Sequence, residues 1–197
     1  MGSKTCDLFE VNTIQDTPIG PSSLIPTING SSIAFKKIDL AVVFSEANST
    51  IESLYEAVRI RHPLLRLSQS DRLDPGKYSQ FLAIEVKSLD GSYYAASVQL
   101  AVWLAAGLQK MKLLRELATE MRSETEPSPV HLLPFMAIAV SGHVWNLHIA
   151  SKADDGVVVR FTSPLLRPFE LWLIVCLVIV IANYKFELAN LRPSCYW

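Results

Sequence analysis

Phe81-Leu-Ala-Ile-Glu-Val-Lys87 is an apolar run that carries two charged side chains. Its length and composition predict a strand. Side chains two residues apart on a strand project from the same face, so Glu85 and Lys87 point the same way. The run Lys37-Ile-Asp-Leu-Ala-Val-Val-Phe44 predicts a second strand, with Asp39 near its start. If the two strands are neighbours, Asp39 and Glu85 form a carboxylate pair beside an ammonium group. Such a pair suits a divalent cation and the charge on a phosphate.

A long helix is predicted directly after the Glu85 strand. Asp90-Gly91-Ser92 marks a turn, and the residues from about Tyr93 to Met121 have a helical apolar stripe. Gln99 falls within that inward stripe, where a buried amide needs hydrogen-bond partners. Two interpretations are open, a packing glutamine bonded to backbone or a side chain directed at the carboxylate pair. The position of the helix, straight after the Glu85 strand, favours the second.

The remaining pattern predicts a mixed α/β (α+β) class, with a central mixed sheet flanked by helices. Residues 1–35 are rich in Pro, Gly, Ser and Thr and predict an irregular N-terminal arm, with one short strand near Ile33–Phe35. Residues 36–197 are then the main domain. Three further strands are expected as an antiparallel meander, at Leu133–Val140, His143–Ile149 and Val157–Phe161.

The middle strand of that meander alternates apolar residues with Asn146 and His148, which predicts a packed face and a wetter one. Four aromatic residues of the helix and the meander are expected to belong to the core or to line a pocket rather than to stack on bases: Tyr93, Tyr94, Trp103 and Trp145. The four histidines lack metal-ligand spacing.

The charge composition bears on whether the protein binds nucleic acid. The formal net charge is −1, and no basic run is longer than Lys36-Lys37. A protein that grips a long nucleic acid usually carries a basic stripe, because phosphate neutralisation dominates that affinity. DNA is therefore a possible partner that the charge pattern does not favour.

The three cysteines have no close spacing and predict neither a disulfide framework nor a zinc site. The first residues lack the apolar stretch of a secretory signal, so an intracellular protein, cytoplasmic or nuclear, is expected. Residues 171–182 form an uncharged apolar run of twelve residues. A membrane span needs roughly 20, so a buried segment is favoured over a membrane anchor.

The order of these elements resembles the PD-(D/E)XK nuclease superfamily. A strand with Asp39, a strand with Glu85-Val-Lys87, and a helix with Gln99-Leu-Ala-Val-Trp103 follow one another. The last motif is similar to the Gln-x-x-x-Tyr helix of the exonuclease-like branch, with Trp in the Tyr place. Over most of residues 35–165 the chain looks like the fungal PD-(D/E)XK nuclease-like domain proteins, whose shared blocks resemble the segments Glu85–Tyr94, Val98–Gly107 and Gly142–Ile149.

The resemblance implies a restriction-endonuclease-like core and hydrolysis of DNA phosphodiester bonds with Mg²⁺ or Mn²⁺. Asp39 and Glu85 would bind the metal, Lys87 would orient water or stabilise charge, and Gln99 would position the metal shell or the substrate. Cores of this superfamily usually open with a helix that carries another acidic ligand. Residues 1–35 offer only Glu10 or Asp16 for that role, and Glu52 and Glu56 lie on a later predicted helix.

Two other classes remain open, because a fold does not determine a function. The fold could enclose a small hydrophobic metabolite and act as a cyclase or isomerase in fungal secondary metabolism, without a metal, with Asp39, Glu85 and Lys87 as polar anchors. It could also be an inactive binding module. A nuclease should show a basic rim and a cation site, a small-molecule enzyme a closed apolar pocket, and a binding module an ordinary Glu85–Lys87 salt bridge.

Overall fold

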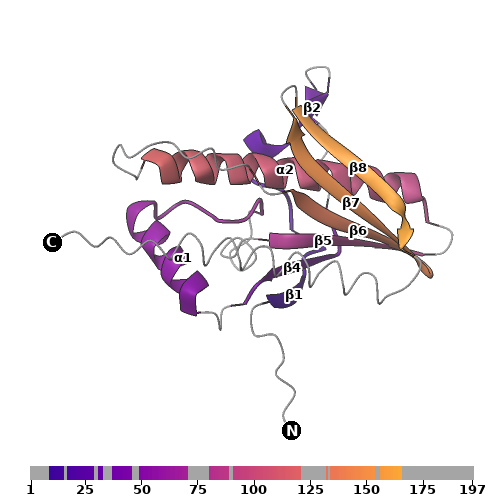
Figure 1. Ribbon diagram of the computed structural model, residues 1–197, viewed down its shortest axis with the longest axis horizontal. Helices are drawn as coiled ribbons and strands as arrows, with labels where there is room; N and C mark the ends of the chain where they lie inside the picture. Colours follow the sequence, from indigo (N-terminus) through magenta and orange to yellow (C-terminus); the bar gives the residue numbers. More distant parts are fainter. Residues whose placement is uncertain are drawn as a thin grey trace, which may run out of the picture.

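The computed structural model contains one six-stranded mixed sheet, in the order β1-β4-β5-β6-β7-β8, with a long helix across one face (Figure 1). The structure describes residues 9–15, 17–28, 31–32, 37–45, 49–70, 80–88, 91–120, 132, 134–153 and 156–165. The predicted mixed α/β class is confirmed.

The helices and strands have the following bounds: β1 Phe9–Thr13, the 3₁₀ helix η1 Ser22–Leu24, β2 Thr27–Ile28, β3 Ser31–Ser32, β4 Leu40–Phe44, α1 Ser49–Arg61, β5 Gln80–Lys87, α2 Tyr93–Glu120, β6 Phe135–Ser141, β7 Val144–Ala153 and β8 Gly156–Leu165.

The pairing of β5 with β6 sets the architecture. These two strands are parallel, whereas the other neighbours in the large sheet pair antiparallel. Parallel strands need a crossover connection, and α2 supplies it. The predicted meander is present as β6, β7 and β8, and Gly142 turns the first hairpin with a φ of 56°, a value that favours glycine.

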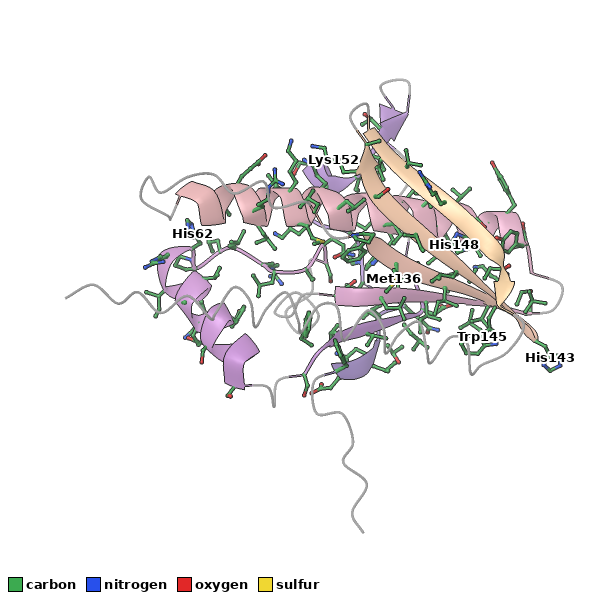
Figure 2. All side chains as sticks on the ribbon, viewed as in Figure 1. His62, Met136, His143, Trp145, His148 and Lys152 are labelled. Carbon is green, nitrogen blue, oxygen red and sulfur yellow. The ribbon has the colours of Figure 1, made fainter. Side chains whose placement is uncertain are left out.

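Small side chains line the sheet face beneath α2. Alanines from four strands lie there in the larger hydrophobic cluster: Ala41, Ala83, Ala137, Ala139 and Ala150. They leave room for the inward side of α2, where Trp103 is fully buried. The Trp103 indole donates a hydrogen bond of 3.1 Å to Gln80, so its polar end is satisfied. The opposite face of the sheet carries a separate apolar cluster around Leu82, Met136, Ile138 and Leu147 (Met136 is labelled in Figure 2).

Gly107 marks the closest approach of α2 to the sheet. A Cβ at this position would lie 2.8 Å from Cε1 of the buried Phe135 ring. We expect Gly107→Ala to lower the free energy of unfolding by about 1–3 kcal/mol, because overpacking outweighs the helix propensity that alanine adds. Urea unfolding would measure this effect. In a Phe135→Leu background the same substitution should be neutral or stabilising, and equal destabilisation in both backgrounds would contradict the steric explanation.

The N-terminal segment differs from the predicted irregular arm. Residues 9–13 form β1, an edge strand that pairs antiparallel with β4. Beyond it, four apolar side chains enter the main core: Ile14, Ile19, Leu24 and Ile25. The local composition hides this strand, because β1 is held by pairing with β4 rather than by its own apolar pattern. The strand expected near Ile33–Phe35 falls outside the described residues.

Several other predictions also concern residues outside the described ranges. These are the three cysteines, Asp16 and the apolar run at 171–182. Within the residues that the structure describes, no helix is long and apolar enough to cross a membrane.

Candidate active site

Asp39 and Glu85 come together at the β4–β5 pairing. Leu40 lies opposite Ile84, and the Asp39 amide donates to the Ile84 carbonyl at 3.2 Å, which extends the antiparallel ladder one step beyond β4. This register sets Asp39 against Glu85, on the sheet face that α2 covers. The condition on which the carboxylate pair depends, that the two strands are neighbours, is therefore met.

The Asp39 side chain is held on both of its oxygens. Its Oδ2 accepts a hydrogen bond of 2.7 Å from the Val86 amide, and its Oδ1 accepts one of 3.2 Å from Gln15 Nε2. Each of these oxygens has a second lone pair. Because Asp39 is only half-buried, a cation or a water can reach that lone pair. Gln15 is a contributor that the sequence analysis missed, since it lies in the predicted arm and no local motif marks it.

Glu85 is the most buried charged group of the site, with 2% of its surface exposed. Its Oε1 lies 2.6 Å from Lys87 Nζ, as the shared strand face requires. Its Oε2 is buried, and no hydrogen-bond donor in the described part of the chain reaches it. Burial raises the pKa of Glu85, the Lys87 hydrogen bond opposes that rise, and the nearby Asp39 charge adds to it.

Gln99 connects the helix to both strands. Its Oε1 accepts a hydrogen bond of 3.0 Å from Lys87 Nζ, and its Nε2 donates to the Lys37 carbonyl at 3.0 Å. Both interpretations of Gln99 are therefore partly met. It is tied to backbone, and it is directed into the site, but its partner there is the ammonium group rather than the carboxylate pair.

Two side chains of β7 extend this polar surface across the sheet. The register places Ala139 between Glu85 and Asn146, and Ala137 between Ala83 and His148. Asn146 and His148 are 7% and 0% exposed, so the prediction of a wetter face is wrong here. They lie under α2, on the same face as the β6 alanines. The sequence carries one signal for this burial: small and large residues alternate in β6, which puts its alanines on the face that a helix can cover closely.

His148 is neutral at physiological pH, because burial lowers its pKa to about 4. Its ring lies 6.2 Å from the Tyr93 ring, measured between centroids. Ser97, one turn after Tyr93 on α2, has a buried hydroxyl that no described group hydrogen-bonds. The polar surface of the site is thus wider than the four residues that the sequence singled out.

The other acidic residues considered lie elsewhere. Glu10 is on β1 and accepts a hydrogen bond from Ser45, and Glu56 pairs with Arg59 on an exposed part of α1 at 2.9 Å. Within the described residues, no group of three or more His, Cys, Asp and Glu side chains gathers in a way that could hold a metal ion. The candidate cation site therefore consists of the Asp39 and Glu85 carboxylates. This is enough for Mg²⁺, which commonly takes one or two carboxylates together with water and substrate phosphate.

Comparison with known families decides the classification. The family model of the PD-(D/E)XK nuclease superfamily matches residues 2–175. The chain belongs to this superfamily. The mixed six-stranded sheet and the two α-helices of the described residues are consistent with the restriction-endonuclease-like fold of PD-(D/E)XK nucleases. Neither a search of curated proteins nor a search of solved structures finds a match.

Membership in the PD-(D/E)XK superfamily supports a nuclease-like function for the chain. The sequence prediction assigns the Glu-x-Lys part of the motif to Glu85 and Lys87 and the preceding acidic position to Asp39. The catalytic and metal-binding roles of these residues and of Gln99 remain predictions.

Proposed function

We propose that the protein hydrolyses phosphodiester bonds of DNA with Mg²⁺ or Mn²⁺. One observation carries this proposal: the buried Glu85 presents an oxygen with no described donor, while Asp39 lies opposite it with lone pairs to spare. A buried acceptor without a donor is costly, and a cation is a ligand that would satisfy it.

The donor set fits such a cation. Asp39 and Glu85 would hold it, and the superfamily typically uses divalent metals. When bound, the metal would lower the pKa of a water and neutralise charge on the phosphate oxygens. Hard divalent cations prefer oxygen ligands, which is the chemistry of these two side chains.

Lys87 would supply the second positive charge at the scissile phosphate. Its side chain is 25% exposed, and its ammonium group lies between Glu85 Oε1 and Gln99 Oε1. With a cation on the carboxylates, Lys87 would turn its charge toward the phosphate or the attacking water. Gln99 would limit where the ammonium group can go, because its amide is anchored at the other end to the Lys37 carbonyl.

The two alternative functions, a small-molecule enzyme and an inactive binding module, have less support. An open cavity of about 570 Å³ lies between η1, α2 and β8, lined in part by Leu24, Ala105, Gln109 and Val157. None of the four candidate residues lines it, although a small-molecule enzyme would need them as anchors. The short Glu85–Lys87 ion pair is a feature expected of an inactive binding module. The second Glu85 oxygen sets this site apart from such a module, because an ordinary salt bridge would not leave it without a donor.

Cleavage of linear, circular and single-stranded DNA by purified protein tests the proposal. We expect Mg²⁺- or Mn²⁺-dependent cleavage that EDTA abolishes and that falls at least about a hundredfold in Lys87→Ala, because a charge at the transition state is lost. Lys112→Ala is the matched control, since Lys112 pairs with Glu116 on the surface of α2 at 3.6 Å. Folded protein that cleaves none of these substrates would overturn the proposal. Cleavage that is unaffected by Lys87→Ala would overturn the assigned site.

A further inference from the structure

Tyr93 and Tyr94 open α2 and are exposed, so they do not belong to the core, which was one of the two roles expected of them, the other being to line a pocket. Their exposed fractions are 42% and 78%, whereas Trp103 is fully buried. Trp145 is partly buried against the second apolar cluster, as expected. Core packing therefore does not account for the positions of these two rings.

Gly91, two residues before Tyr93, lies against the Lys87 side chain. The Gly91 amide donates to the Ser88 carbonyl at 2.9 Å, and the Ser92 hydroxyl accepts from the Ala95 amide at 3.2 Å as the cap of α2. A Cβ on Gly91 would lie 2.9 Å from the Lys87 Cβ, so a larger residue does not fit at this position without a shift. The end of β5, the start of α2 and the β6–β7 turn lie on one side of the molecule (Figure 1).

The inner side of Tyr93 is supported by β7. The ring lies 6.2 Å from the His148 ring, with 38° between the two planes. His148, labelled in Figure 2, is fully buried, and the strand register places it on the face of the sheet that also carries Glu85. Tyrosine has few rotatable bonds, and this support restricts them further. The exposed part of the ring is therefore a preformed flat surface beside the candidate site.

We propose that Tyr93 is a stacking surface for an unpaired base, and that the preferred substrate is a single strand or a frayed DNA end. This inference rests on the proposed function. A base stacked on an aromatic side chain contributes about 1–3 kcal/mol to binding, independently of sequence. Such a contribution suits a chain with a net charge of −1 and no basic run longer than two residues, because binding of a long duplex depends on phosphate neutralisation. Inside an intact duplex the bases are paired and stacked on one another, so they cannot reach the ring.

Tyr94 is the internal control for this role. It is adjacent on the helix and more exposed, but it projects about 100° further round α2. If exposure alone attracted bases, both tyrosines would contribute. If the site depends on support from β7, only Tyr93 should.

The test measures binding of a short fluorescent single strand and of the blunt duplex of the same sequence, by anisotropy, with full-length protein carrying Glu85→Gln to prevent cleavage. We expect Tyr93→Ala to weaken single-strand binding about tenfold, within the range of one stacked base. Tyr93→Phe should keep the affinity, Tyr94→Ala should leave it unchanged, and duplex binding should not respond to Tyr93→Ala. An oligonucleotide with abasic sites should bind equally to the protein with and without Tyr93→Ala.

The failures of the two proposals are distinguishable. Metal-dependent cleavage by the unmodified protein, together with single-strand binding that Tyr93→Ala changes less than twofold, overturns the stacking role and leaves the nuclease function standing. Single-strand binding that depends on Tyr93, without any cleavage, supports stacking and overturns hydrolysis. An equal loss in Tyr93→Phe and Tyr93→Ala, or an equal loss of duplex binding, also overturns stacking, because the hydroxyl or the fold would then be responsible.

Discussion

Glu85→Gln is expected to abolish metal-dependent cleavage, by at least about a thousandfold, and at the same time to raise the free energy of unfolding by about 1 kcal/mol. Activity would fall because a neutral amide is a poor ligand for a hard divalent cation. Stability would rise because the ionised carboxylate is 2% exposed and its Oε2 has no donor within the described residues. Glutamine keeps an oxygen that can accept from Lys87 and removes the buried charge.

The stability gain should depend on pH in a defined direction. Because the pKa of Glu85 is raised above its usual 4.5 in the folded protein, its protonated form favours folding. That contribution is fully present below pH 4.5 and is lost as the pH rises through the folded-state pKa. The advantage of Glu85→Gln should therefore appear at pH 7.5 and disappear at pH 4. Urea unfolding in EDTA at both pH values measures it.

Glu56→Gln is the matched control, because Glu56 lies on α1 in a largely exposed pair with Arg59. It should change stability by less than about 0.5 kcal/mol and leave cleavage intact. A loss of stability in Glu85→Gln would mean that the Glu85–Lys87 ion pair is a structural support. That result would favour the inactive binding module.

His148 is expected to make the second large contribution to pH dependence, about 3 kcal/mol of folding stability lost between pH 7 and pH 4. Its pKa is lowered by burial from 6.5 to about 4, so the folded state resists the proton that the unfolded state accepts. Stability is fully present above pH 6.5 and declines as the pH falls toward 4. Below that pH the folded imidazole is protonated as well, and the loss stops increasing.

Comparison with His148→Gln isolates this contribution from those of the carboxylates. The glutamine variant should show a shallower fall in unfolding free energy over the same pH range. His143→Gln, at the exposed β6–β7 turn, should keep the full dependence of the unmodified protein (Figure 2). Parallel curves for the unmodified protein and His148→Gln would show that His148 is not held neutral.

The local sequence pattern was sufficient to predict contacts between residues that lie close together in the chain. Two residues on one strand share a face, so the contact of Lys87 with Glu85 follows from their spacing. The inward stripe of a helix that begins six residues after Lys87 places Gln99 over the sheet. The meander follows from short loops between apolar runs, since such loops bring consecutive strands together.

The pairing of strands that are distant in sequence and the burial of side chains could not be predicted from the local pattern, because they depend on contacts between distant parts of the chain. Asp39 faces Glu85 only because β4 pairs with β5, and Gln15 reaches Asp39 from a segment that local composition marks as irregular. Asn146 and His148 alternate with apolar residues as a solvent-facing pair would, yet the coverage of their face by α2 buries them.

The sequence by itself determined the residue types of the site and the strand and helix that carry them, because those follow from periods of two and 3.6 residues. Only the tertiary structure decided that β4 pairs with β5 and β5 with β6, which side of the sheet α2 covers, and therefore that Glu85 is buried and Tyr93 exposed. The physical reason is that a period fixes the direction of a side chain relative to its own backbone. What that side chain meets is set by the packing of the rest of the chain.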